Sequence, residues 1–92
     1  MSDSPSSAFE IVGERIREAR LQSGLTQEEV AHAAGVNVSY YGKLERGLNN
    51  PTLDTLVRIC AVIGANLSHL VVGLEEAQLP VRSAWPRRGP RR

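Results

Sequence analysis

The sequence predicts an all-α fold, a compact bundle of five helices, from three observations. Apolar residues recur at three- and four-residue spacings in five successive segments. Residues that favour helix starts or stops, chiefly Thr, Asn and Gly, stand at the ends of most of these segments. The expected connections are only two to five residues long, which is typical of a small bundle with mostly local contacts.

The first helix is expected to run from about Phe9 to Gln22, after a Ser- and Pro-rich start that predicts disorder over residues 1–8. Its buried stripe should comprise Val12, Ile16 and Ala19. Three glutamates, at positions 10, 14 and 18, line another face at four-residue spacing. We interpret them as a solvated face, with an acidic site for a partner as the alternative.

Residues 26–47 should hold two short helices that meet at a glycine. Thr26 and Glu29 have the spacing of a capping box, which starts a helix at Gln27. Its buried residues should be Val30, Ala31 and Ala34. Gly35 ends this helix, because a left-handed residue is needed where the chain turns.

Asn37 is positioned to cap the second of these helices, which closes at Gly47. Its apolar stripe should be Val38 or Tyr40, with Tyr41 and Leu44. Two helices joined by so short a connection cannot lie side by side, so they must cross steeply. The pair therefore indicates a helix-turn-helix.

The fourth helix should begin after Thr52, because Pro51 blocks continuation from before it, and should run from Leu53 to about Ile63. Its expected core residues are Leu53, Leu56, Val57, Cys60 and Ile63, with Asp54 and Arg58 as an outward pair. Gly64 stops this helix. Asn66 is expected to cap a short fifth helix carrying Leu67, Leu70 and Val71.

Composition narrows the class of protein. A chain of 92 residues forms one small domain. Its single cysteine cannot form an internal disulfide, and no Cys/His spacing predicts a zinc site. No signal peptide or membrane span is visible, so a cytoplasmic protein is expected. No nucleophile has a base at plausible spacing and no glycine-rich phosphate loop occurs, so we expect no enzyme and no cofactor.

Charge is divided unevenly along the chain. From Pro80 onward there are five arginines and no acid, whereas the preceding residues carry ten acidic side chains against six basic ones, a net charge of −4. Residues 75–92 contain no sustained helical period and are expected to form a flexible Arg-rich tail. The local field around any binding site must therefore matter more than the total charge.

The motif residues resemble a known family. Gln27, Ala31 and Gly35 stand where the phage-repressor (lambda repressor and Cro-like) helix-turn-helix family has its Gln, small residue and turn glycine. The resemblance continues through three segments: LERG at 44–47, NPTLDTL at 50–56 and IGANLSHL at 63–70. It implies a lambda-repressor-like DNA-binding domain over residues 9–74. The segment LERGLNNPTLDTL also resembles the small controller proteins of restriction-modification systems.

The resemblance implies that the second helix of the motif reads base edges in the major groove. The implied base-facing residues are Val38, Ser39, Gly42 and Lys43. Lys43 can donate to guanine, Ser39 is promiscuous, and Val38 can pack on a thymine methyl. Val38 and Gly42 depart from the polar residues that the family usually places at two or three of these positions. Close approach to DNA and simple tolerance of glycine both remain open.

Contacts to DNA phosphates are expected from a second set of residues, which fix position without reading sequence. These are Gln27, Tyr40, Arg46, Asn49, Asn50 and Thr52. Gln27 opens a helix whose free N–H groups attract an anion. Tyr41 occupies the inward position where the family prefers Ile or Val, so its hydroxyl must reach the surface or find a partner.

The resemblance also implies a structural pair between Arg20 and Glu45, which would tie the first helix to the end of the recognition helix. A surface pair of almost no energetic value is the alternative. Ala31 and Gly35 would be structural because they let the two helices approach and turn.

A domain this small spans about half a turn of major groove, so a homodimer on a near-palindromic operator is expected, with half-sites one turn (~34 Å) apart. The expected dimer surface is Leu67, Leu70, Val72 and Leu74.

A repressor or autoregulator, controlled by its own concentration, fits this organisation. The alternative is the antitoxin of a toxin–antitoxin pair, with the tail engaging a toxin. The tail arginines could otherwise contact DNA, reach acidic patches on the domain or aid solubility.

Overall fold

The computed structural model describes residues 7–77. They form five α-helices and a short 3₁₀ helix: α1 (Ala8–Ser23), α2 (Gln27–Ala34), α3 (Val38–Glu45), α4 (Leu53–Ile63), α5 (Leu67–Val71) and the 3₁₀ helix Leu74–Glu76. The predicted all-α fold is confirmed. The expectations for residues 1–6 and 78–92 lie outside the described residues. Within residues 7–77, no helix has both the length and the apolar character needed to cross a bilayer.

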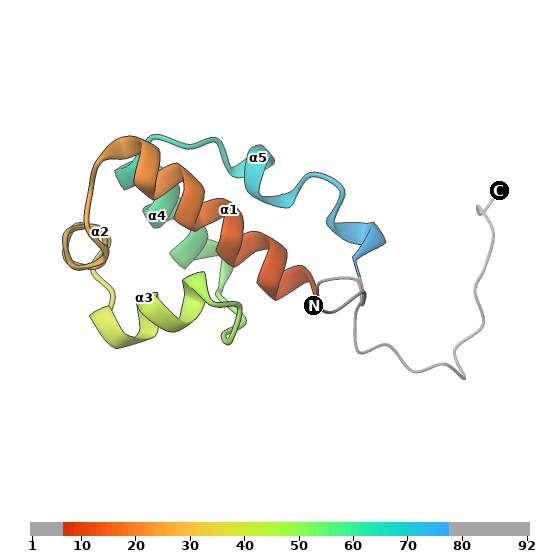
Figure 1. The fold of residues 1–92 in the computed structure, drawn as a ribbon, viewed down its shortest axis with the longest axis horizontal. Coiled ribbons are helices and arrows are strands. Elements are labelled where there is room, and N and C mark those ends of the chain that lie inside the picture. Colours follow the sequence, from red (N-terminus) through yellow and green to blue (C-terminus); the bar gives the residue numbers. More distant parts are fainter. Residues whose placement is uncertain (1–6, 78–92) are drawn as a thin grey trace, which may run out of the picture.

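Helix α1 is the central element of the bundle (Figure 1). It packs against α3, α4, α5 and the 3₁₀ helix, whereas α2 packs against α3 and α4. Figure 1 views α2 end-on while α3 lies across the picture, so the two helices cross steeply, as the short connection predicts. The core between the helices is filled mainly by aliphatic side chains. Those less than 2% exposed include Ile16, Val30, Ala31, Leu44, Ile59 and Leu70.

The buried face of α4 differs from the predicted one. Leu53 and Val57 were expected in the core but are 67% and 48% exposed, whereas Ile59, which was not expected there, is fully buried. Both sets of residues fit a helical period, so the pattern alone could not choose between them. Packing of α4 against α1 and α2 selects the face that carries Leu56, Ile59, Cys60 and Ile63.

Helix α1 starts earlier than the sequence suggested. The Ser7 hydroxyl accepts a hydrogen bond from the Glu10 N–H at 3.2 Å, and the Glu10 carboxylate accepts one from the Ser7 N–H at 3.1 Å. This capping box corrects the assignment of Ser7 and Ala8 to a disordered start. It also gives Glu10 a role beyond that of a solvated face. At the other end, the 3₁₀ helix continues beyond the expected domain boundary at residue 74.

Helices α1 and α3 approach closely at Gly13, which is buried in the middle of α1. A Cβ atom at this position would collide with the Leu44 carbonyl oxygen and would lie 2.7 Å from that of Glu45. Both atoms belong to the backbone of α3, so neither can move aside independently. The absence of a side chain at Gly13 therefore sets the distance between α1 and the helix that the motif presents.

Candidate nucleic-acid interface

Local hydrogen bonds fix the two helices of the motif. The Thr26 hydroxyl accepts from the Glu29 N–H at 3.0 Å, and the Glu29 carboxylate accepts from the Thr26 N–H at 2.9 Å. Gly35 ends α2 with a φ of +75°, in the left-handed region that favours glycine. Asn37 then caps α3 by accepting from the Tyr40 N–H at 3.0 Å. These bonds account for the start of each helix and the turn between them.

A buried ion pair ties α3 to α1. Arg20 Nε donates to Glu45 Oε2 at 2.7 Å, and Arg20 Nη2 donates to Glu45 Oε1 at 3.1 Å. Arg20 and Glu45 are only 9% and 6% exposed, so the pair lies inside the domain rather than on its surface. Arg20 Nη1 also donates to the Leu25 carbonyl at 3.0 Å. The guanidinium thus joins α1, the loop before α2 and the end of α3.

The side chain of Gln27 belongs to the same network. Its Nε2 donates to Glu45 Oε1 at 2.9 Å, so the amide connects the first residue of α2 with α3. The sequence predicts a phosphate contact for Gln27 but not this contact with Glu45, because nothing in the local pattern indicates a partner eighteen residues away. Its phosphate contact stays a prediction, to which the free N–H groups at the start of α2 would contribute.

The network determines the ionisation of its members. Burial alone would raise the pKa of Glu45, but hydrogen bonds led by that from Arg20 outweigh it and lower the pKa. The hydrogen bond to Glu45 raises the pKa of Arg20. Glu45 is therefore held as a carboxylate and Arg20 as a guanidinium.

Tyr41 is fully buried beside this network, and its hydroxyl finds no hydrogen-bond partner of acceptable geometry among the described residues. Neither expected outcome, escape to the surface or a bonded partner, is observed. Burial, followed by the proximity of Glu45, raises the pKa of Tyr41 far above its usual value. The phenol is a neutral core residue, which leaves Tyr40 as the half-buried tyrosine on the outer side of α3.

Three of the four predicted reading residues gather around a hollow on α3. It has a volume of about 290 Å³ and is lined by Gln27, Val38, Ser39, Gly42 and Arg46. Val38 is 42% exposed, and Ser39, Lys43 and Arg46 are exposed as well. Three of the four predicted base-facing residues thus meet Gln27 of α2 and Arg46 at the end of α3. Lys43 does not line the hollow.

Two other residues predicted to contact phosphate, Asn49 and Thr52, make hydrogen bonds within the domain. Asn49 Nδ2 donates to the Tyr40 carbonyl at 3.0 Å, which ties the loop to α3. The Thr52 hydroxyl caps α4 by accepting from the Thr55 N–H at 3.1 Å, and it donates to Thr55 Oγ1 at 3.0 Å. Asn50 is exposed. The phosphate contacts of these three residues stay predictions.

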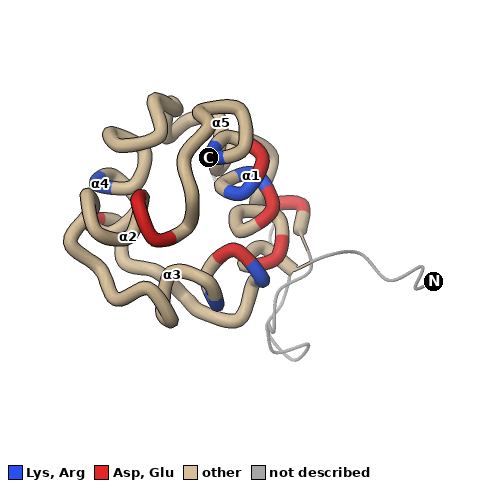
Figure 2. Tube along the Cα trace, turned by 60° about the vertical axis from the view of Figure 1, so that its left-hand side comes forward, with Lys and Arg blue, Asp and Glu red and all other residues tan. Residues whose placement is uncertain are grey.

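Figure 2 shows acidic and basic residues interleaved along α1, whereas acidic residues stand together at the start of α2. The exposed charged residues of α3 and its end are Lys43 and Arg46, because Glu45 is buried against Arg20. Glu28 and Glu29 stand at the start of α2, where the helix dipole favours acidic residues. The outward face of α3 is therefore locally positive on a net-acidic domain.

The expected dimer surface needs correction. Leu70 is 1% exposed and belongs to the core, so it cannot contact a second copy. Leu67 and Leu74 are partly buried against that core, whereas Val72 is 62% exposed. One face of the short α5 packs against α1. A helix of five residues is too short for its apolar pattern to show which side chains lie on that face.

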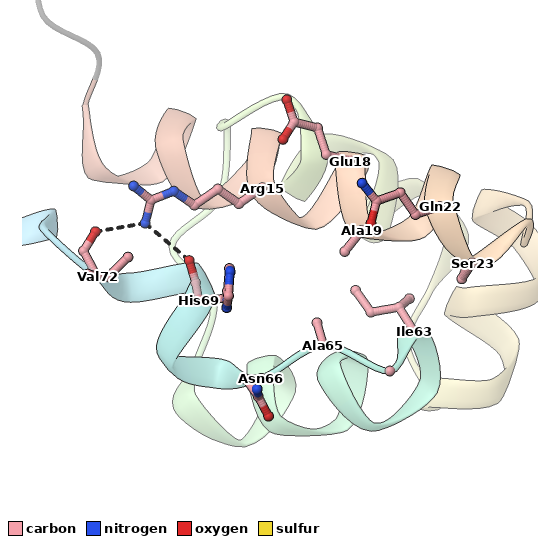
Figure 3. A pocket seen from close by; sticks show the side chains of 11 residues that line it. Arg15, Glu18, Ala19, Gln22, Ser23, Ile63, Ala65, Asn66, His69 and Val72 are labelled. Carbon is pink, nitrogen blue, oxygen red and sulfur yellow. Dashed lines mark hydrogen bonds between the residues drawn. The ribbon is translucent and has the colours of Figure 1, made fainter.

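Helix α5 lacks its expected N-cap bond, and Arg15 holds its C-terminal end to α1 (Figure 3). Asn66 stands at the N-cap position but makes no capping hydrogen bond with its side chain. Arg15 Nη1 instead donates to the carbonyls of His69, Leu70 and Val72 at 3.3, 3.2 and 2.8 Å. An open hollow of about 770 Å³ lies beside these contacts, between α1 and the segment leading into α5.

A short helix that ends at a left-handed glycine, followed by a steeply crossing helix with an exposed, locally positive face, defines a helix-turn-helix DNA-binding domain. The Helix-turn-helix family model matches residues 16–70, so the chain belongs to this family. It is a transcriptional regulator rather than an enzyme. Matched relatives include phage repressors, which confirms the resemblance seen in the sequence.

Three similar proteins illustrate the match. The chain is 40% identical to the HTH-type transcriptional regulator DdrOP3 of Deinococcus deserti over 62 aligned residues. The aligned region covers 67% of this chain and 48% of that regulator. The restriction-modification controller protein C.AhdI from Aeromonas hydrophila superposes with a TM-score of 0.65 at 32% identity, covering 67% of this chain and 94% of the controller. SinR, a master regulator of biofilm formation solved in complex with DNA, gives a TM-score of 0.62 at 34% identity, covering 65% and 97%.

Proposed function

We propose that this regulator binds double-stranded DNA sequence-specifically, with α3 in the major groove, and acts as a repressor or autoregulator. The observation that carries the proposal is the outward face of α3. Val38, Ser39 and Lys43 are exposed there, and no side-chain hydrogen bond to another described residue occupies the two polar ones. Similarity to a structure solved in complex with DNA supports DNA as the ligand of this domain.

The roles proposed for individual residues follow from their donors and shapes. Lys43 donates to guanine O6 or N7, Ser39 contacts either type of base, and Val38 packs against a methyl group. Arg46, Tyr40 and Asn50 lie at or near the ends of α3 and contact phosphates. Gln27, Asn49 and Thr52 add phosphate contacts through the groups that their internal hydrogen bonds leave free.

Replacement of Lys43 tests this assignment. Lys43→Ala is expected to weaken binding to a selected duplex by about 1–3 kcal/mol, or roughly 5- to 150-fold, and to relax specificity at one base pair. Arg17→Ala is the matched control, because Arg17 is exposed on α1 and the change removes the same charge. Fluorescence anisotropy titrations of both variants at one salt concentration measure the effect. Equal losses in the two variants would mean that only net charge matters and that α3 does not read the sequence.

We further propose that the protein binds as a homodimer to a near-palindromic operator. One α3 reaches only a few base pairs, and a two-fold dimer doubles the site that is read. After the correction at Leu70, the proposed surface consists of exposed Val72 with the partly buried Leu67 and Leu74 around it. Such a regulator would act on DNA in the cytoplasm. The antitoxin alternative depends on the Arg-rich tail, which lies outside the described residues, and no observation within residues 7–77 favours it.

A further inference from the structure

The hollow on α3 exists because one side chain is missing from a continuous face. Val38, Gly42 and Arg46 follow one another at four-residue spacing, so they lie along one side of the helix. Gly42 leaves the middle of this row empty, and Gln27 from α2 lies beside the gap. Arg46, the residue that caps the end of α3, lines the same hollow at the other end of this row.

Protein packing does not require glycine at this position. A Cβ atom on Gly42 would lie 3.7 Å from Gln27 Oε1, which is an ordinary van der Waals contact. Alanine is favoured over glycine inside a helix by up to ~1 kcal/mol, so stability alone would favour a methyl group here. Gly13 differs, because a Cβ there collides with backbone atoms of α3. The space at Gly42 is thus open toward solvent and unexplained by folding.

We propose that this hollow is a specificity pocket for the C5-methyl group of a pyrimidine base, and that the base is thymine. The inference rests on the proposed placement of α3 in the major groove. The thymine methyl is the apolar group that unmodified bases project into that groove. Val38, 42% exposed and outside the hydrophobic core, supplies an apolar wall, and Gly42 lets the methyl approach the helix backbone.

The polar rim offers a donor for the group that thymine carries next to its methyl. Thymine presents the O4 acceptor next to its methyl, whereas 5-methylcytosine presents the N4 amino donor. Arg46, on the rim, offers donors only. Arg46 can therefore donate to thymine O4. The rim also carries acceptors, Gln27 Oε1 and the Ser39 hydroxyl, so the assignment to thymine rests on its methyl being the one that unmodified DNA carries, and the selection with 5-methylcytosine below tests it.

The test is a two-by-two comparison of protein and DNA. A duplex obtained by selection is synthesised with each thymine of the bound motif replaced in turn by uracil, which lacks only the methyl group. For the wild-type protein, one such replacement should weaken binding about three- to fivefold, the loss expected for one buried methyl. Gly42→Ala places a methyl group where the thymine methyl would lie, so it should bind the thymine duplex more weakly and discriminate thymine from uracil by less than about 1.5-fold at that position.

Folding and general effects are controlled separately. Gly42→Ala should raise the midpoint of urea unfolding, so weaker binding cannot be attributed to loss of structure. Gln22→Ala, on the exposed face of α1, should keep the wild-type ratio of thymine to uracil affinity.

Distinct outcomes identify which claim fails. A wild-type protein that binds thymine and uracil duplexes equally at every position overturns the pocket but leaves DNA recognition intact, as does undiminished discrimination by Gly42→Ala. If no duplex is selected at all, DNA recognition fails and the pocket fails with it. In a second selection from a pool containing 5-methylcytosine in place of cytosine, enrichment of that base where thymine was selected overturns the assignment to thymine.

Discussion

Glu45→Ala is expected to lower the free energy of unfolding by about 3–5 kcal/mol, a large part of the stability of a small domain. The substitution leaves the Arg20 guanidinium buried without its carboxylate and removes the acceptor of the Gln27 amide. Three segments lose a common anchor as a result: α1, the start of α2 and the end of α3. Urea unfolding followed by circular dichroism measures the change.

The exposed ion pair on α4 provides the control for this prediction. Arg58 and Asp54 also form a pair, with N–O distance 3.0 Å, but their side chains are 48% and 78% exposed. Asp54→Ala should therefore change stability by less than about 1 kcal/mol. A double-mutant cycle with Arg20→Ala should show strong coupling to Glu45. Equal effects of the Glu45 and Asp54 substitutions would show that the Arg20–Glu45 network does not anchor the helices.

The same network predicts a dependence on pH. The pKa of Glu45 is lower in the folded state than its ordinary value, so the carboxylate stabilises the fold above the unfolded pKa of about 4.3. That contribution is lost as the pH falls through the lower, folded-state pKa. Glu45→Gln has no carboxylate to titrate here, so its stability should decline less steeply over the same acidic range.

Gly13→Ala should lower the free energy of unfolding by about 3 kcal/mol, even though alanine is the better helix former. The added methyl group would collide with the Leu44 carbonyl oxygen and lie 2.7 Å from that of Glu45, so α1 and α3 must separate. Separation also strains the Arg20–Glu45 pair, which bridges the same two helices. Thermal unfolding should shift by about 4–8 °C for each kcal/mol lost.

Gly42→Ala is the matched control for this prediction, because both glycines lie inside helices and differ in what a Cβ would meet. The two substitutions should change stability in opposite directions. If Gly13→Ala stabilises the protein as Gly42→Ala does, α1 and α3 do not approach each other closely at Gly13.

Local sequence was sufficient for the elements with strong end signals. Thr26 with Glu29, Asn37, Thr52 and the glycines after the helices place the bounds of α2, α3 and α4, because each signal acts through a hydrogen bond or backbone conformation within a few residues. The same logic would have found the start of α1 from Ser7 and Glu10. The Ser- and Pro-rich composition around Ser7 obscured that signal.

Features that depend on packing between helices were harder to predict. The stripe on α4 has two helical solutions, and contact with α1 and α2 decides between them. Leu70 resembles a surface apolar residue until α1 covers it. Gln27 reaches Glu45 only because the steep crossing brings the start of α2 to the end of α3. Val38, Ser39 and Gly42 line one hollow, but that hollow also needs Gln27 from α2, which the pattern along α3 alone does not indicate.

The most direct test of DNA recognition through α3 is selection of bound duplexes from a random pool, carried out with the full chain at low salt. The proposal predicts enrichment of one motif with two half-sites related by two-fold symmetry and centred one helical turn, about 34 Å, apart. Lys43→Ala, selected in parallel, should enrich the same motif with one base pair in each half-site relaxed. Absence of any enriched motif, or a motif that Lys43→Ala leaves unchanged, would contradict the account.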